Sequence, residues 1–237
     1  MYSRLHNSFP ARMPVSIGVM GIRLLIIFIG IVLWHVTQRL LARRNTTDAG
    51  SSPLGITDGI HRITARLHQR LHRMPVRADL LLVVSSLVVD ALGIYLIVAG
   101  IVGRTIEPII GLLALFGLRQ ICQAFCPLPP PEGMIWRKPR FRVPTLFVTY
   151  DTANDLFFSG HTAVAVYGCA TLAGALGAPG IAIGILLVTF EIWVVLTLRA
   201  HYTMDVFTGA ITALYVHRVA IDFAPRVDEW IRLLVGA

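Results

Sequence analysis

The chain has 237 residues, of which 55% are hydrophobic and 14% are charged. A soluble globular protein carries roughly 25% charged residues to cover its surface, and a disordered chain combines low hydrophobicity with high charge, so both classes are excluded. The net charge of +8 would raise the question of nucleic acid in a soluble protein. Beside apolar spans it is better explained by basic cytoplasmic loops and by anionic lipid, so no nucleic-acid partner is expected.

Six apolar segments approach the roughly 20 residues that cross a bilayer, and they predict an all-α, six-transmembrane-helix integral membrane bundle. The segments cover residues 15–36, 80–102, 106–126, 161–178, 181–198 and 204–219. Between the fourth and fifth, Ala178-Pro179-Gly180 is expected to form a turn that makes an antiparallel hairpin. The expected division is an N-terminal helix, linker and interfacial helix (1–79), a catalytic transmembrane core (80–223) and a C-terminal tail (224–237).

The segment 59–77 between the first two spans repeats apolar residues at helical spacing. The apolar stripe is Ile60, Ile63, Leu67, Leu71 and Met74, with Arg62, Arg66, Arg70, Arg73 and Arg77 on one flank and His61, His68 and His72 on the other. This pattern predicts an amphipathic helix in the headgroup plane, with arginine stems extended toward lipid phosphates. A solvated basic linker is the alternative.

A long polar connection, residues 127–158, separates the third and fourth spans. It opens with Pro127-Leu128-Pro129-Pro130-Pro131, and proline at this density blocks helix and sheet alike, so we expect an extended surface loop. Loops of this kind often carry functional residues.

Two short polar stretches, 154–162 and 199–205, interrupt the apolar pattern and contain His161 and His201. The 40 residues between the histidines suffice for one span, a tight turn and one span back. Both histidines are therefore expected on the same side of the membrane.

His201 and Asp205 are four residues apart, which places them one helical turn apart on one face. The carboxylate can fix the imidazole tautomer and leave the other ring nitrogen as a nucleophile. Ser159 is placed to cap the fourth span, so the N–H groups near Gly160 and His161 would face a phosphate. With His161 as proton donor, the set describes phosphoryl transfer through a phosphohistidine. The structural alternative is that each histidine satisfies its own hydrogen bonds.

No cofactor is indicated, and we expect no metal. Cys122, Cys126 and Cys169 lie in or at the ends of apolar segments without a metal-like spacing to histidine, and we interpret them as reduced structural residues. A metal site built from His161 and His201 with Asp205 is a weaker alternative, since no second acidic cluster accompanies it.

The segments Asp155-Leu-Phe-Phe-Ser159-Gly160-His161-Thr162 and His201-Tyr202-Thr203-Met204-Asp205-Val206 resemble the two catalytic motifs of the sphingomyelin synthase branch of the type 2 phosphatidic acid phosphatase superfamily. The resemblance covers roughly residues 80–219. It implies that His201 is the nucleophile, that Asp205 orients it, and that His161 first protonates the leaving alcohol and then activates the acceptor.

The chain departs from the phosphatase members of that superfamily. They carry a Lys-x6-Arg-Pro motif, which is absent here, and an arginine six residues before the nucleophile, where this chain has Val195. Such cations clamp the dianion of a phosphate monoester. Their absence favours a phosphodiester, as used by the synthases and by plant phosphatidylcholine:diacylglycerol cholinephosphotransferase.

Further candidate substrate-binding residues flank the catalytic ones. Aromatic rings near Asp155 could hold a cationic headgroup; the candidates are Tyr150, Phe157, Phe158 and Tyr202. Glu191 lies inside the fifth span, where an ionisable group is by default functional or paired, and Asp90 and Arg119 are its candidate partners.

The sequence therefore predicts a membrane enzyme that transfers a phosphocholine or phosphoethanolamine head from a glycerophospholipid to ceramide or diacylglycerol. The alternatives are a lipid phosphate phosphatase and a non-catalytic lipid-binding membrane protein. The expected partners are membrane lipids, and homo-oligomerisation is left open.

Charge also predicts an orientation. The connections after the first, third and fifth spans hold thirteen lysines and arginines, whereas the termini and the other loops hold six. Positive charge stays cytoplasmic, so the count places the active site on the cytoplasmic face. The resemblance to sphingomyelin synthases implies the lumenal face instead.

Overall fold

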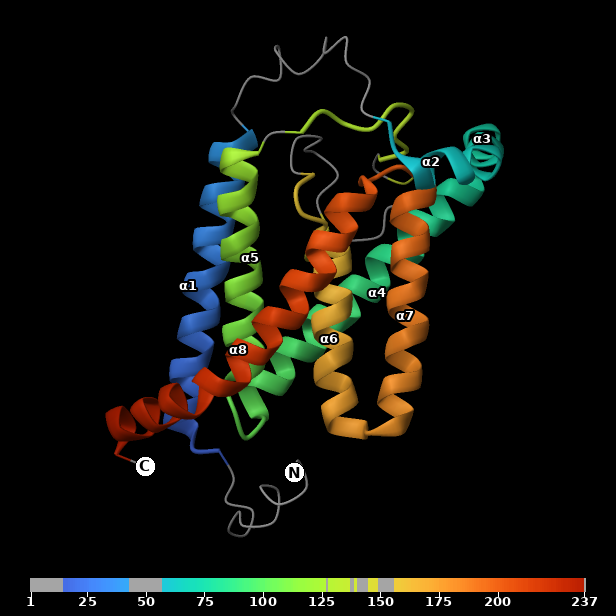
Figure 1. Ribbon diagram of the computed structural model, residues 1–237. Helices are drawn as coiled ribbons and strands as arrows, with labels where there is room; N and C mark the ends of the chain where they lie inside the picture. The colour runs from blue at the N-terminus through green and yellow to red at the C-terminus, as the bar shows by residue number, and fades with distance from the viewer. Residues whose placement is uncertain are drawn as a thin grey trace.

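The computed structural model describes residues 15–42, 57–126, 128–136, 139, 145–148 and 156–236, and all regular structure in them is helical. The helices are α1 (Ile17–Ala42), α2 (Gly59–Ile63), α3 (Ala65–Arg73), α4 (Pro75–Val102), α5 (Glu107–Phe125), α6 (Gly160–Leu176), α7 (Ala178–Thr197) and α8 (Thr203–Val235). The long helices form one bundle, and α2 and α3 lie across one of its ends (Figure 1). The all-α prediction is confirmed for the described residues.

Five helices, namely α1, α4, α5, α7 and α8, are long and apolar enough to cross a membrane. The remaining candidate, α6, is apolar but has 17 residues, or ~26 Å at the usual rise per residue, which is less than the roughly 30 Å of a bilayer core. It packs against α4, α5, α7 and α8, and its residues 161–169 are all buried. The shortest of the bundle helices, α6, is therefore the one at the centre of the bundle.

The hairpin of α6 and α7 turns one residue earlier than the sequence indicates. Gly177 connects the two helices with a φ of 66°, a conformation that glycine adopts without steric cost. Ala178 and Pro179 already belong to α7 because proline is well tolerated in the first helical turn. A Cβ at Gly180 would lie 2.5 Å from the carbonyl oxygen of Leu172, so this glycine permits the close approach of the two helices.

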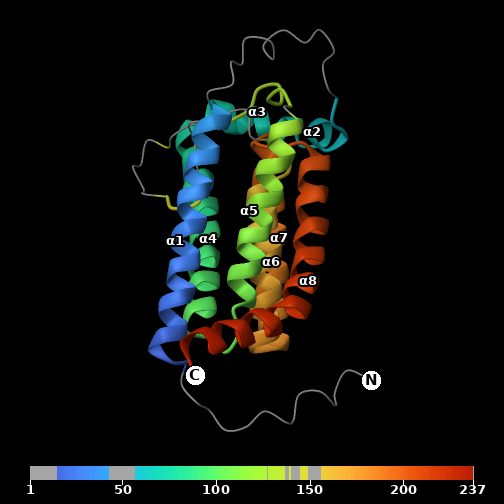
Figure 2. The same cartoon turned by 90° about the vertical axis from the view of Figure 1, so that its left-hand side faces the viewer.

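The expected continuous helix over 59–77 is wrong, because the segment consists of α2, α3 and the first turn of α4. Asp58 caps α2 by accepting hydrogen bonds from the N–H groups of Ile60 and His61. The chain leaves helical geometry at Met74, as expected for a residue that precedes a proline, here Pro75. The break lets α3 lie across the bundle end while α4 enters the bundle (Figure 2).

Helix α8 continues well past the expected end of the sixth span, through Pro225 to Val235. Figure 2 shows that it bends and that its last part runs toward the end of α1, and an internal proline explains such a bend. There Asp228 forms a buried ion pair with Arg23 of α1 at 2.7 Å. Residues of the expected tail are therefore helical and packed against the core.

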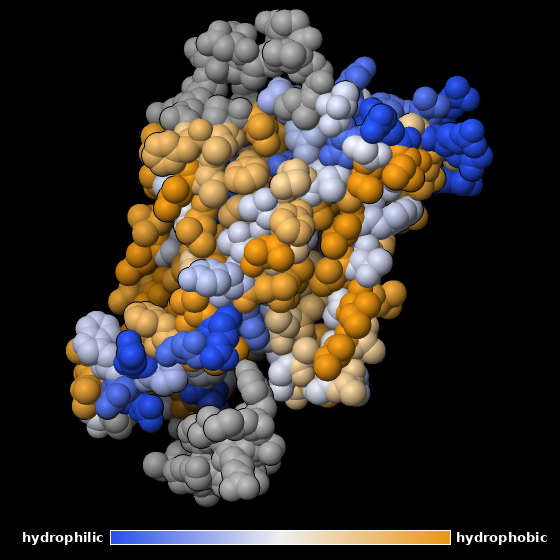
Figure 3. Space-filling model, viewed as in Figure 1, coloured by the Kyte–Doolittle hydropathy of each residue, from blue (hydrophilic) through white to orange (hydrophobic). Residues whose placement is uncertain are grey.

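Apolar side chains cover the middle of the bundle, and polar ones gather at its two ends, over α2–α3 and over the C-terminal part of α8 (Figure 3). Large apolar side chains in the middle are highly exposed, for example Leu186 at 70% and Leu214 at 53%. An exposed apolar belt between polar ends is the surface expected of a protein embedded in a bilayer.

Candidate active site

The first turn of α6 presents His161 at the end of the bundle on which α2 and α3 lie. Ser159 caps this helix, since its hydroxyl oxygen accepts hydrogen bonds from Thr162, from the N–H at 3.3 Å and from the hydroxyl at 3.0 Å. The Ser159 N–H donates to the Asp205 carbonyl oxygen at 3.1 Å. This bond joins the starts of α6 and α8, which carry the two motifs.

The turn between α7 and α8 carries His201. Arg199 in this turn has a φ of 55°, an unusual conformation for a non-glycine residue. Its guanidinium donates to the Glu132 carbonyl oxygen at 2.8 Å, and the Ile135 N–H donates to the Leu198 carbonyl oxygen at 2.9 Å. The proline-rich loop therefore holds the turn in a fixed shape.

The two histidines and the aspartate are buried together. His161 is 8% exposed, His201 5% and Asp205 0%. Asp205 Oδ2 accepts the Tyr202 N–H at 2.9 Å and lies 3.7 Å from His201 Nδ1. That separation exceeds a hydrogen bond, but such contacts often tighten when substrate binds. Because Nδ1 faces the carboxylate, Nε2 is the nitrogen left for substrate.

Three buried polar atoms of this group have no hydrogen-bond partner within the described residues. They are His161 Nε2, His201 Nδ1 and Asp205 Oδ1. A buried polar atom without a hydrogen-bond partner lowers the stability of the folded protein, so folding alone gives no reason to keep it. His201 Nδ1 faces the Asp205 carboxylate, and His161 Nε2 is available to a group of the substrate.

Both histidines line one pocket of about 540 Å³, counted with its open mouth. The pocket is lined by Val89, Phe116, Arg119, Met134, Trp136, Phe147, Val148, Leu156, Gly160, His161, Val164, Ala200 and His201. The Trp136 ring meets the His161 ring edge to face, with 5.3 Å between centroids. The Phe116 and Phe147 rings stack at 6.1 Å. The pocket thus joins the two histidines to an aromatic wall.

Arg119 of α5 brings a positive charge into this pocket. Its Nε donates to the Phe158 carbonyl oxygen at 3.1 Å. A Cβ at Gly160 would lie 3.1 Å from the same nitrogen, so the guanidinium lies directly beside the first turn of α6. Arginine and a helix N-terminus both favour anions, and together they make this wall suitable for a phosphate.

Asp90 acts on the same pocket from a distance. Its carboxylate accepts the Leu146 N–H at 3.0 Å and the Phe147 N–H at 2.9 Å. This fixes residues 145–148 against α4 and places Phe147 and Val148 in the pocket wall. Asp90, a candidate partner of Glu191, is bonded to this loop instead.

Several predicted site residues lie outside the pocket lining. Glu191 is fully buried between helices, where its Oε2 accepts the Ser85 hydroxyl at 2.6 Å. Phe158 is part of the apolar core at 1% exposure, and Phe157 is half-buried. Tyr202 stacks on His61 and donates its hydroxyl to the Pro129 carbonyl oxygen at 3.2 Å.

Asp155 and Tyr150, which the sequence also nominates, lie outside the described residues. The aromatic residues that do line the pocket come from α5 and from the long loop, and the sequence patterns that predict the site do not include them. The one usable signal was Trp136, a large apolar ring in a polar loop. Phe116 has no such signal, because a phenylalanine in an apolar span is ordinary.

Within the described residues, no group of three or more His, Cys, Asp or Glu side chains is arranged to hold a metal ion.

The fold and the site define a multi-pass integral membrane protein with two buried histidines around one pocket. The family model of AtPDCT1/2, the phosphatidylcholine:diacylglycerol cholinephosphotransferases, matches residues 57–222, more than half of the chain. The chain belongs to this family. No curated protein and no solved structure matches it. The match includes α2–α3 and both histidine motifs and ends within α8.

Proposed function

We propose that this protein moves phosphocholine between phosphatidylcholine and diacylglycerol through a covalent intermediate on His201. The observation that carries the proposal is the shared pocket of His161, His201 and Arg119, within a chain of the cholinephosphotransferase family. The mechanism is the one implied by the resemblance to sphingomyelin synthases.

In the first step, Nε2 of His201 attacks the phosphorus of phosphatidylcholine. The bond between phosphorus and the glycerol oxygen breaks, and His161, whose protonated form the bound phosphate anion favours, gives its proton to that oxygen, so diacylglycerol leaves. Asp205 stabilises the positive charge that forms on the His201 ring. Arg119 and the first-turn N–H groups of α6 balance the phosphoryl charge as it redistributes.

In the second step, a different diacylglycerol occupies the place of the first. Neutral His161 takes the proton of its hydroxyl group, the oxygen attacks phosphorus, and the bond to His201 breaks. His201 and protonated His161 are thereby restored. The reaction exchanges one ester for another, so it needs no nucleotide and no metal ion for balance.

The pocket wall is consistent with a choline head. Trp136, Phe116 and Phe147 present ring faces and edges in the same pocket as Arg119, and a quaternary ammonium binds aromatic rings within about 6 Å. Val195, which stands where the phosphatases have a clamping arginine, is 1% exposed and packs in an apolar cluster. This favours the single negative charge of a diester over the dianion of phosphatidic acid.

We also propose that α6 completes a sixth span. Thinning of the bilayer at a short helix costs only a fraction of a kcal/mol per Å, and α6 is shielded by four neighbouring helices. Six spans place both termini on one face, opposite the active site. The charge distribution favours the cytoplasmic face for the active site.

The test uses purified protein in vesicles that contain choline-labelled phosphatidylcholine and diacylglycerol with different acyl chains. Mass spectrometry should detect labelled phosphatidylcholine that carries the acceptor's acyl chains. Transfer to ceramide, added in place of diacylglycerol, would indicate a sphingolipid synthase. Hydrolysis of phosphatidic acid, added as the donor, would indicate a phosphatase. His161→Ala should lower the rate by about 10²–10⁴, whereas His35→Ala, an exposed histidine of α1, should not. Preference for phosphatidic acid with release of inorganic phosphate would reject the transferase.

A further inference from the structure

The α2–α3 segment has an outer face that is strongly basic. The four arginines of α2–α3 and Arg77 in the first turn of α4 are all exposed; the four are Arg62, Arg66, Arg70 and Arg73. Between residues 59 and 78 there is no acidic residue; the flanking Asp58 is engaged in hydrogen bonds and Asp79 is fully buried. The positive charge of this face is therefore not neutralised by carboxylates of its own segment.

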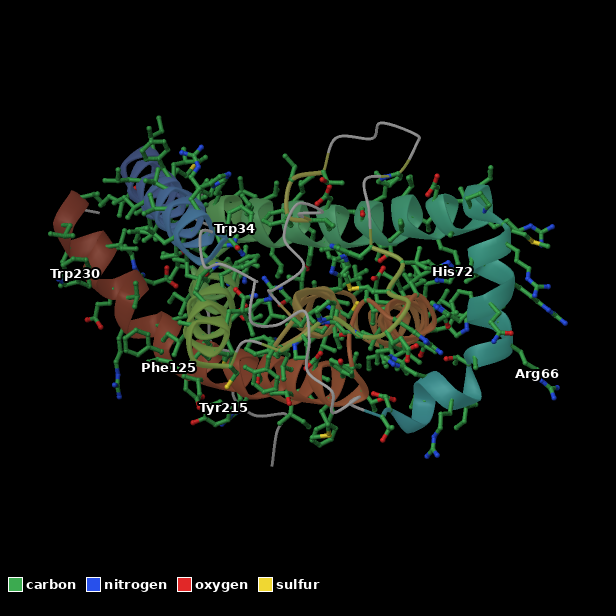
Figure 4. All side chains as sticks on the ribbon, turned by 90° about the horizontal axis from the view of Figure 1, so that it is seen from above. Trp34, Arg66, His72, Phe125, Tyr215 and Trp230 are labelled. Carbon is green, nitrogen blue, oxygen red and sulfur yellow. The ribbon has the colours of Figure 1, made fainter. Side chains whose placement is uncertain are left out.

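Apolar side chains border the same face. Ile63 is 79% exposed, Val76 54% and Met74 42%. The segment lies across the bundle end, next to the apolar belt (Figure 3), and viewed from above Arg66 points away from the bundle while His72 lies toward it (Figure 4). Exposed guanidinium groups beside exposed apolar groups match a bilayer interface with anionic headgroups better than they match bulk water.

The inner face of the same segment is bonded to the catalytic turn. Asp58 accepts the Thr203 N–H and hydroxyl, both at 2.7 Å. The His61 ring donates to the carbonyl oxygen of His201 at 3.0 Å, and the His68 ring donates to that of Thr197 at 2.9 Å. One short segment therefore carries the arginines on one side and holds the backbone of the nucleophile on the other.

The protonation states of Asp58 and His68 near neutral pH favour these contacts. Burial alone would raise the pKa of Asp58, but the hydrogen bonds from Thr203 and from the His61 N–H outweigh it and hold the pKa below its usual value. Burial lowers the pKa of His68, with a further contribution from the nearby Arg199 charge. Asp58 is thus ionised and accepts its hydrogen bonds as a carboxylate, and His68 is neutral and donates from the ring nitrogen that faces Thr197.

We infer that anionic glycerophospholipids bind the arginine face of α2–α3 and thereby activate the transferase, by stabilising the state in which this segment holds the His201 turn. The inference on activation rests on the proposed function. Guanidinium groups bind phosphate headgroups by paired hydrogen bonds. A ligand that binds the docked segment better than a detached one shifts the population toward the docked state, in which the His201 backbone is fixed.

The first experiment compares transfer rates in vesicles of phosphatidylcholine and diacylglycerol with and without phosphatidylglycerol. The wild type should be activated about fivefold or more, a common size for coupling between sites. Arg66→Gln with Arg70→Gln and Arg73→Gln should abolish the activation. The matched control replaces Arg104, Arg218 and Arg226, exposed arginines at or toward the other end of the bundle, and should keep it. Equal activation of both triple variants would overturn the inference, as would activation of the wild type by soluble glycerol phosphate alone.

The second experiment does not depend on turnover. Hydrogen exchange of residues 57–74 should slow when phosphatidylglycerol is added to the wild type and to the control variant, but not to the triple variant in α3. The fraction of a spin-labelled phosphatidylglycerol that is held at the protein should likewise be larger for the wild type and the control variant than for the triple variant in α3. Protection without any transfer in either vesicle would reject the proposed function and retain the lipid site. Exchange that is unchanged by phosphatidylglycerol would reject the lipid site, whatever the transfer rate.

Discussion

Replacement of Gly209 by alanine should disturb the active site without touching a catalytic side chain. Gly209 lies in the second turn of α8 and faces the N-terminus of α6. A Cβ there would lie 2.7 Å from the carbonyl oxygen of Ser159 and 3.6 Å from the backbone nitrogen of Ala163. Neither atom belongs to a side chain that could rotate away, so the two helices must separate.

The size of the effect follows from this distance. Carbon and carbonyl oxygen atoms approach to about 3.3 Å at closest in ordinary contacts, so relief requires a displacement of about 0.6 Å. The displaced bond is the one from the Ser159 N–H to the Asp205 carbonyl oxygen, which joins the two motifs. A misplacement of 1 Å can cost a factor of about 10² in rate, and overpacking costs about 1–3 kcal/mol of stability. We expect a 10- to 100-fold lower kcat for Gly209→Ala.

The assay is transfer of labelled phosphocholine in vesicles, with thermal unfolding in detergent to verify folding. Gly117→Ala in α5 and Gly174→Ala in α6 are matched controls, because a Cβ at either position has no neighbour within 4 Å. Both should remain as active as the wild type. Full activity of Gly209→Ala with unchanged stability would refute the inferred contact between α6 and α8.

Asp205→Asn should leave the fold intact and lower kcat by up to about 10⁴, because an amide neither fixes the His201 tautomer nor stabilises its positive charge; steady-state kinetics and thermal unfolding check both parts. Asp58→Asn should speed hydrogen exchange of residues 57–74 at neutral pH. Because the pKa of Asp58 is depressed, the wild-type carboxylate stabilises the docked segment above about pH 4. This stabilisation is lost as the pH falls through the depressed pKa, so the difference in exchange between the two proteins should vanish in acid. Glu132→Cys should be protected from an impermeant thiol reagent added outside intact cells, since basic loops stay cytoplasmic; labelling from outside would reverse the proposed orientation.

The sequence was sufficient for the parts of this protein that depend on local pattern. Apolar segments predicted the helices, and the 40-residue separation of His161 and His201 predicted that both lie at one end of the bundle. Both line one pocket, because α6 and α7 form the expected hairpin. Even there, the position of the turn depended on whether Pro179 ends a loop or begins a helix, and a proline suits both.

The rest of the site depends on contacts between distant segments, which leave no local pattern. Arg119 is one of two candidate partners that the sequence offers for Glu191, since both lie in apolar spans, but the helices place Glu191 against Ser85 and Arg119 in the pocket. Similarly, the sequence places His61 and His68 on one flank of an amphipathic pattern, but it does not show which segment packs against that flank. Only the folded chain shows that they bond to carbonyl oxygens of the catalytic turn.

The central claim is that His201 carries phosphocholine covalently, and rapid acid-free quenching tests it most directly. Purified protein is mixed with choline-labelled phosphatidylcholine in the absence of added diacylglycerol, denatured at alkaline pH within milliseconds, and digested for peptide mass spectrometry. The account predicts a phosphocholine adduct on the peptide that contains His201, stable in base, released by acid, discharged by added diacylglycerol and absent from His201→Ala. Transfer at the wild-type rate by His201→Ala, or an adduct on another residue of the active enzyme, would contradict it.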